Sequence, residues 1–340
     1  MKTKVKMLAA GVSAAVMLGL SSQASATVYA GSSLALSSLQ IAIGQFDGQT
    51  IVPGGATVTN FNFNLTNTAT LGSNVEATVA TCFGTPASNN CGANPTLDAL
   101  EADLGSINRV NNATGADGTL LWYALDGGDW SNSDSVVKTA QLVNGVPTST
   151  DQIAQSNITN LQSAAANAEI KSTTGFTFTF TVTNTGELSL SFLADPDMIA
   201  QIVGEPNALS LANMNVSFTL QQNTGGSAFV RWAPEGTAAN ECIAFNGPTC
   251  VETVDSEDLN LNVTTSANNT SATHSYDPNA AGLQRYGIFV TGLTEGTWTL
   301  GLNAVTSTLI TRVPEPGILS LMGLGLLGIG ASQRRRTKTA

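Results

Sequence analysis

The stretch FTFTFTVTNTGELSLSF, residues 176–192, alternates apolar with mostly hydroxyl side chains. Successive side chains in a strand point to opposite faces, so the apolar residues in 176–182 would share one face and the threonines the other. After the turn Asn184-Thr185-Gly186, the same period resumes in residues 188–192. The pattern predicts two half-buried antiparallel strands that form a hairpin.

The same period recurs along much of the chain. It is clear in residues 61–65, 216–220, 259–263 and 298–302, and shorter candidates are residues 34–43, 75–82, 120–125, 228–233 and 287–291. Ten or more such strands, separated by Gly, Asn and Pro, predict an all-β antiparallel sandwich of jelly-roll type.

Little helix is expected. Residues 96–104 are one short candidate, and residues 153–168 carry apolar side chains at helical spacing, although an irregular connection fits them equally well. The body, residues 27–312, is expected to be one elaborated sandwich, because all-β domains of roughly 200 to 250 residues are common. If there are two lobes, their boundary should fall within residues 144–170, the least strand-like part of the body.

The four cysteines form two close pairs, Cys82 with Cys91 and Cys242 with Cys250. Each pair encloses a loop with glycine and proline, and an even count at neighbouring positions favours local disulfides at hairpin tips. Such bridges imply an oxidising compartment. The alternative, a metal site made of all four thiolates, would need C-x-x-C-like spacing, which is absent.

Charge excludes one class of partner. The chain has 13 Lys+Arg against 24 Asp+Glu, and after both ends are set aside six basic residues remain against 23 acids, which leaves the body near −17. Phosphate backbones would be repelled, so no nucleic-acid partner is expected. A surplus of acids suits solubility outside the cell or binding of divalent cations.

A short acidic loop with two glycines is the best candidate for a metal site. Its oxygen-bearing residues are Asp126, Asp129, Asn132 and Asp134. Such a loop can wrap oxygen ligands around Ca²⁺, although its spacing differs from that of an EF-hand. A second acidic run, Asp255, Glu257 and Asp258, is a weaker candidate, which could instead be a charged edge against aggregation. Solvated loops are the alternative for both. No other cofactor is expected.

Catalysis has little support in the sequence. The one histidine, His274, lies in a polar stretch, and the chain has no G-x-S-x-G motif, so we expect no enzyme. A secreted hydrolase acting on polysaccharide stays the alternative, which a convergent carboxylate pair in a cleft would favour. An aromatic platform for sugars could use Trp122, Tyr123, Trp130 and Trp232, unless these residues pack in the core.

Residues 1–26 have the three regions of a secretory signal peptide. Lys2, Lys4 and Lys6 precede the apolar residues 7–20, and Ala24-Ser25-Ala26 follows as a small-residue cleavage site. We therefore expect cleavage after Ala26 and export.

Three features follow one another near the other end. They are Val313-Pro314-Glu315-Pro316, the apolar residues 317–331, and the basic cluster Arg334-Arg335-Arg336. Residues 313–340 thereby resemble the PEP-CTERM sorting signal, also called the ice-binding protein C-terminal domain, of Gram-negative-type bacteria. The prolines fix their own φ and disfavour helix at the residues before them, so the motif is expected to be extended.

This resemblance implies a processing partner, the membrane-embedded exosortase, which would cut near residues 314–316. The apolar segment would be a transmembrane helix of about 22 Å that tethers the protein to the inner membrane before processing. The arginines would stay on the cytoplasmic side. The processed protein would reach the cell surface or the extracellular medium.

Beyond sorting, the resemblance implies a structural or interaction protein of the cell surface or extracellular matrix. Exopolysaccharide is the partner that family association suggests. Residues 216–236 and 27–30 are also weakly similar to exosortase-dependent surface antigen-like proteins.

Overall fold

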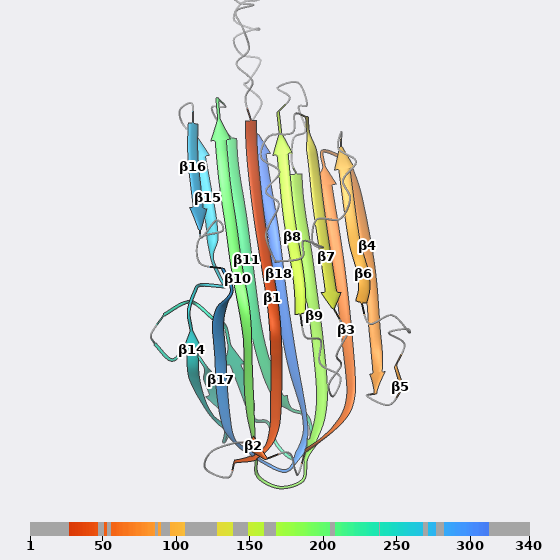
Figure 1. The fold of residues 1–340 in the computed structure, drawn as a ribbon, viewed down its shortest axis with the longest axis vertical. Coiled ribbons are helices and arrows are strands. Elements are labelled where there is room, and N and C mark those ends of the chain that lie inside the picture. Colours follow the sequence, from red (N-terminus) through yellow and green to blue (C-terminus); the bar gives the residue numbers. More distant parts are fainter. Residues whose placement is uncertain are drawn as a thin grey trace, which may run out of the picture.

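The computed structural model describes most of the chain between residues 27 and 312. The described ranges are 27–46, 51–52, 56–85, 88–89, 96–105, 128–138, 149–159, 168–204, 208–237, 239–267, 271–276 and 282–312. Within them every regular element is a β-strand, and the strands form two antiparallel sheets packed face to face (Figure 1). The predicted antiparallel sandwich is confirmed. The predicted signal helix in residues 1–26 and the C-terminal helix in residues 313–340 fall outside the described residues.

Sheet I has the strand order β14-β17-β10-β1-β8-β7-β6, with β2 beside β1 and β16 beside β10. Its strands are β1 (Thr27–Phe46), β2 (Ile51–Val52), β6 (Thr96–Gly105), β7 (Trp130–Lys138), β8 (Ser149–Ile158), β10 (Gly186–Val203), β14 (Thr249–Asp255), β16 (Ser271–Tyr276) and β17 (Gln284–Leu293).

Sheet II has the order β13-β12-β11-β18-β9-β3-β4-β5, with β15 beside β11. Its strands are β3 (Ala56–Leu71), β4 (Asn74–Thr85), β5 (Ser88–Asn89), β9 (Ala168–Val182), β11 (Ala208–Gln222), β12 (Phe229–Trp232), β13 (Ile243–Phe245), β15 (Asn262–Ala267) and β18 (Gly296–Arg312). The 18 described strands, nine in each sheet, exceed the eight that the two sheets of a simple jelly roll have together.

The alternating sequence determines which side of each strand faces the interior. Buried positions alternate along β11 with partly exposed ones, because one face packs on sheet I and the other meets solvent. The core is rich in aromatic rings: Phe192 stacks on Tyr286 at 5.0 Å between ring centroids and contacts Phe218 at 5.2 Å. Burying each such side chain stabilises the fold by about 1.5 to 3 kcal/mol.

The predicted hairpin at residues 176–192 is wrong. β9 pairs with β3 and β18, whereas β10 pairs with β1 and β17, so residues 183–185 carry the chain from sheet II to sheet I. Both strands alternate because both bury one face in the shared core. Alternation specifies the buried face, and it does not specify the pairing partner.

Both helix candidates form strands where the structure describes them. Residues 96–104 lie in β6, and residues 153–158 lie in β8, paired with β1 and β7. In β8 the apolar Ile153, Ala154 and Ile158 mimic a helical period, but the polar residues between them are buried as well. Strands on both sides of residues 144–170 contribute to each sheet, since β10 pairs with β1 in sheet I and β9 pairs with β3 in sheet II. The predicted strand at residues 120–125 falls outside the described residues.

Polar side chains divide the interior into two apolar parts. We call these side chains the polar seam: Ser32, Asn67, Ser135, Gln152, Ser156, Ser210, Thr306 and Thr308, all buried. Along β1, β11 and β18, the seam separates the large aromatic core from a small apolar cluster of Val28, Ala30, Ile158, Ile202, Ala208 and Ile310. Bonds within the seam join the sheets, such as the Oγ of Ser156 to the Oγ1 of Thr308 at 3.0 Å.

Candidate functional site

The first and last described residues lie at the same end of the sandwich. Thr27 opens β1 opposite Val203, and Arg312 closes β18 opposite Ala208, so both are next to the link between β10 and β11 (Figure 1). The small apolar cluster packs beneath this end. Val313 therefore follows a strand that β9 and β11 hold on both sides.

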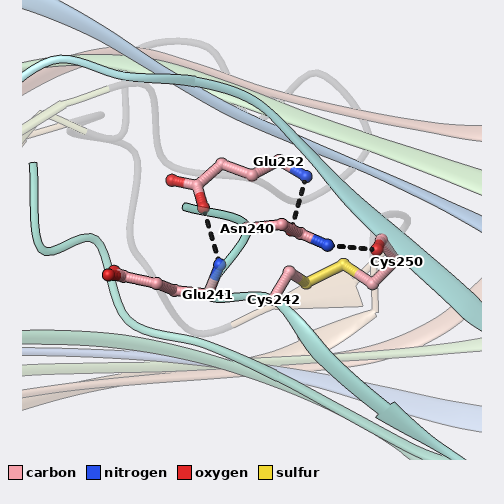
Figure 2. Close-up of a disulfide and its surroundings, with 5 residues drawn as sticks. All are labelled: Asn240, Glu241, Cys242, Cys250 and Glu252. Atoms are coloured by element: carbon pink, nitrogen blue, oxygen red, sulfur yellow. Dashed lines mark hydrogen bonds between the residues drawn. A yellow bond between two sulfur atoms is a disulfide. The ribbon is translucent and has the colours of Figure 1, made fainter. Parts of the chain in front are cut away.

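A disulfide joins the two sheets at one lateral edge of the sandwich. Cys242, just before β13 of sheet II, is bonded to Cys250 in β14 of sheet I, with 5.7 Å between their Cα atoms (Figure 2). The predicted bridge is confirmed, but it does not staple a hairpin tip, because β13 and β14 belong to different sheets. Cys82 is buried, and its predicted partner Cys91 lies outside the described residues, so that pair stays a prediction.

Hydrogen bonds extend this junction along β14 (Figure 2). The side chain of Asn240 donates to the carbonyl oxygen of Cys250 at 3.1 Å and accepts from the backbone N–H of Glu252 at 3.0 Å. The carboxylate of Glu252 accepts from the N–H of Glu241 at 3.0 Å. The loop before Cys242 is thus fixed to the other sheet by covalent and polar contacts together.

Two carboxyl groups, Glu252 and Asp255, hold this loop, and we call them the carboxyl pair. Asp255 Oδ2 accepts from the N–H of Glu235 at 2.9 Å and of Gly236 at 2.8 Å. Burial, followed by the hydrogen bond with Glu252, raises the pKa of Asp255 to about 7. Gly236 has φ 67°, and a Cβ there would lie 2.6 Å from the backbone nitrogen of Asp258, so only glycine fits this tight turn.

The second acidic run, residues 255–258, also meets this region, where Asp258 forms an isolated β-bridge with Glu235. Asp258 Oδ1 accepts from the N–H of Asn260 at 2.7 Å, and burial raises the pKa of Asp258. Burial also raises the pKa of Tyr286, with a smaller contribution from the charge of Glu257. Within the described ranges, no group of three or more His, Cys, Asp or Glu is arranged to hold a metal ion.

The predicted calcium ligands are only partly brought together. Asn132 and Asp134 lie in β7, buried, and the Nδ2 of Asn132 donates to the Oδ1 of Asp134 at 3.3 Å. Asp129 instead accepts from the N–H of Thr159 at 2.8 Å, and Asp126 lies outside the described residues. The prediction of one solvated loop is wrong for Asn132 and Asp134, because buried polar neighbours surround this strand. Calcium binding stays a prediction.

The aromatic residues proposed as a sugar platform pack inside where they are described. Trp130 and Trp232 are buried, and Trp232 lies 5.2 Å from Phe218 between ring centroids. Trp122 and Tyr123 lie outside the described residues. His274 is exposed on β16, with Nδ1 3.2 Å from the carbonyl oxygen of Thr264.

The outer face of sheet II is a broad surface of amide and hydroxyl groups. Its exposed or partly exposed polar side chains include Asn62, Asn64, Thr66, Thr68, Thr177, Thr179, Thr299, Asn303, Asn215, Ser217, Thr219 and Gln221. Among described side chains at outward positions of β3, β9, β11, β12 and β18, Arg231 is the only charged one. Asn64 and Asn303 flank Gly175 in one row across three strands, and a Cβ at Gly175 would meet only open space and ordinary contact.

Comparison with known proteins identifies the segment that follows β18. Residues 312–336 match the family model of the PEP-CTERM protein-sorting motif. The chain carries a PEP-CTERM sorting motif. The match contains both the Val313–Pro316 element and the arginine cluster at 334–336, which confirms the resemblance seen in the sequence.

This PEP-CTERM motif implies an exported protein that an exosortase processes and that ends on the cell surface or outside the cell. No curated protein and no solved structure matched the chain. The similarity of residues 216–236 to exosortase-dependent surface antigen-like proteins is not confirmed. No helix in the described residues has the length and apolar character needed to span a membrane.

Sequence reasoning singled out Asp255 in the second acidic run, but it did not find the pairing of Asp255 with Glu252 or the polar seam. Glu252 and Asp255 are three positions apart in β14. The pairing of β14 with β17 has a register shift between Glu252 and Val254, and such a shift changes the direction in which the side chains along the strand point. A bulge of this kind has no signature in the sequence of β14.

Proposed function

We propose that this PEP-CTERM protein is a non-catalytic structural protein of the cell surface or extracellular matrix. The observation that carries the proposal is that the sorting motif directly follows β18, at the end of the sandwich where Thr27 also lies. Removal of residues 1–26 and exosortase processing would then both occur at one end. The opposite end would be the part presented to the surroundings.

The dimensions of the sandwich support such a presenting role. β18 has 17 residues, which at about 3.4 Å per residue gives a body roughly 55 to 60 Å long. β18 pairs with β9 and β11 along nearly its whole length. A tail attached to this central strand would transmit force into the middle of sheet II and not to an edge strand.

Surface delivery can be tested by labelling intact cells with a membrane-impermeant amine reagent. The test variant replaces Pro314, Glu315 and Pro316 by Ala together, and the control replaces Thr337 and Thr339 by Ala, outside the matched residues 312–336. We expect labelled wild type and control on the surface or in the medium, and the test variant in the inner-membrane fraction. An unchanged distribution of the test variant would contradict the proposal.

For the partner, we propose exopolysaccharide bound to the outer face of sheet II. Amide and hydroxyl groups can both donate to and accept from sugar hydroxyls, and the shortage of acids on this face avoids repulsion of an acidic polymer. Each exposed hydrogen bond adds only about 0.5 to 1.5 kcal/mol. Affinity would therefore come from many repeated contacts along one polymer chain.

Co-sedimentation with polysaccharide purified from the host tests this partner. The variant Asn64→Glu with Asn303→Glu places two negative charges beside Gly175, and Thr249→Glu with Thr253→Glu adds the same charge at the exposed β14 edge. We expect only the first pair to reduce binding. Equal binding by both variants would exclude the outer face of sheet II as the binding surface.

A further inference from the structure

Two phenylalanine rings lie on the outer face of sheet II, at its β13 edge. Val230 and Trp232 of β12 are buried in the core. The residues that alternate with them, Phe229 and Arg231, therefore point outward. Phe245 of β13 lies directly opposite Phe229, and the two rings stack with 6.5 Å between their centroids. Because Phe245 is 56% exposed, this stacked pair presents apolar surface to solvent.

Arg231 lies at the next outward position of β12, opposite Ile243, which is itself 51% exposed. Two residues along a strand span roughly 7 Å, a distance comparable to one sugar residue. Among described side chains at outward positions of β3, β9, β11, β12, β13 and β18, Arg231 is the only charged one. We call Phe229, Arg231, Ile243 and Phe245 the aromatic corner.

Contacts on both sides of β13 hold the aromatic corner in place. Before the strand, Cys242 is bonded to Cys250 of sheet I (Figure 2). After the strand, Asn246 has φ 59°, and its Nδ2 donates to the carbonyl oxygen of Ser227 at 3.0 Å and to the Oγ of Ser227 at 3.2 Å. Ser227 precedes β12, so this contact joins the ends of the two strands that carry the phenylalanines. A surface fixed in this way loses little conformational entropy when it binds a partner.

Polar side chains continue from the phenylalanine pair across the sheet. The residues paired in one row with Phe229 are Gln221, Thr299, Thr179 and Asn60, on successive strands from β11 to β3. All four are exposed or partly exposed. From β13 to β3 the row measures roughly 24 Å at about 4.8 Å between neighbouring strands. A polymer lying along it would contact aromatic rings at one end and amide and hydroxyl groups over the rest.

The chemistry of the aromatic corner fits a sugar that carries a carboxylate. The flat apolar face of an exposed ring can pack against the C–H face of a sugar ring. A guanidinium binds a carboxylate through two parallel hydrogen bonds. The body carries a net charge near −17, so an acidic polymer is repelled over much of the surface. At Arg231 the same polymer is attracted, which favours an acidic sugar over a neutral one.

We propose that the aromatic corner is a binding site for a carboxylated sugar residue, with the sugar ring against Phe245 and the carboxylate on Arg231. The inference rests on the proposed binding of exopolysaccharide to the outer face of sheet II. It specifies the class of sugar and the place on that face where it binds.

Calorimetric titration of the exported protein with oligomers of galacturonate and of mannuronate tests the charge. Neutral galactose and mannose oligomers of equal length are the comparison. We expect wild type to bind at least one acidic oligomer, and Arg231→Gln to weaken that binding about tenfold, because a charge-assisted hydrogen-bond pair is lost. Arg285→Gln removes an exposed arginine on β17 of sheet I, and this matched control should bind like wild type.

The aromatic contribution is tested in the same titration. Phe245→Ser should weaken binding of the acidic oligomer about fivefold, because the packing surface for the sugar ring is removed. Val251→Ser, at the 49% exposed position on β14, is the control for loss of an exposed apolar side chain and should bind like wild type.

Three results would overturn this binding site. The first is a wild type that binds acidic oligomers no better than neutral ones, and the second is binding that Arg231→Gln leaves unchanged. The third is a dimeric wild type that Phe245→Ser converts to a monomer in light scattering, since a second copy would then cover the corner. Co-sedimentation with the host polysaccharide is read separately: a wild type that sediments with it and binds no acidic oligomer contradicts only the carboxylated-sugar site.

Discussion

Asn67 of β3 and Ser135 of β7 exchange two hydrogen bonds across the interior of the sandwich. The Nδ2 of Asn67 donates to the Oγ of Ser135 at 2.9 Å, and that Oγ donates to the Oδ1 of Asn67 at 3.1 Å. Both residues are fully buried. Polar contacts thus join sheet II to sheet I in the buried interior, where apolar packing is usual.

Because a buried polar group left without its partner costs about 1 to 3 kcal/mol, Ser135→Ala and Asn67→Ala should each lower the free energy of unfolding by that amount. The double variant should lose less than the sum, with a coupling energy on the order of 1 kcal/mol. Urea unfolding of all four proteins measures this cycle. Strictly additive losses would show that the two side chains do not act together.

Replacing Cys242 and Cys250 by Ala should lower the free energy of unfolding by about 2 to 3 kcal/mol, the value expected for a short closed loop. The bridge also joins the sheets, so proteolysis should become faster between residues 235 and 248. Cys250→Ala alone breaks the same bridge and should match the double variant to within a few tenths of a kcal/mol. A double variant as stable as wild type would show that the carboxyl pair alone holds this edge.

The raised pKa of Asp255 predicts a pH dependence of stability. Its pKa is 3.8 in the unfolded reference and about 7 in the folded protein, so the folded state binds this proton more tightly. The contribution is fully present below 3.8 and is lost as pH rises through about 7. Because Asp255 is partly exposed, solvent screening reduces the effect to roughly 1 kcal/mol.

Asp255→Asn imitates the protonated group, since its amide oxygen can still accept from Glu235 and Gly236. Wild type should lose stability as pH rises from 3.8 to about 7, and this variant should lack the share of that loss that comes from Asp255. Urea unfolding of both proteins at several pH values in this range measures the difference. Glu295→Gln, at an exposed acid away from this loop, is the control. If Asp255→Asn loses stability with rising pH as steeply as wild type, another group is responsible.

The sequence predicted the strands better than their pairing. The period of two identified β3, β9, β10, β11 and β18, since one face of each strand is buried in the core. The pairing partner of each strand depends on whether the link after it stays in one sheet or crosses to the other. The sequence of residues 183–185 is compatible with a hairpin turn and with a crossover between sheets. The predicted turn was therefore placed correctly and its role was wrong.

Buried polar strands were harder to recognise. Asn132 and Asp134 resemble a solvated loop in the sequence, because polar residues at alternate positions usually face water. In β7 both residues are buried, and their neighbour Ser135 bonds with Asn67 of the other sheet. Such complementarity between segments distant in sequence leaves no local pattern, whereas the cysteine spacing and the motif at residues 313–316 are local and were read directly.

The PEP-CTERM motif implies that an exosortase processes this sandwich at the segment following β18. Intact-mass spectrometry of the exported protein, from host strains with and without the exosortase, measures this directly. We expect the protein from the exosortase-positive strain to begin at Thr27 and to lack Arg334 through Ala340. A product from that strain that still ends in these residues would contradict exosortase processing at this motif.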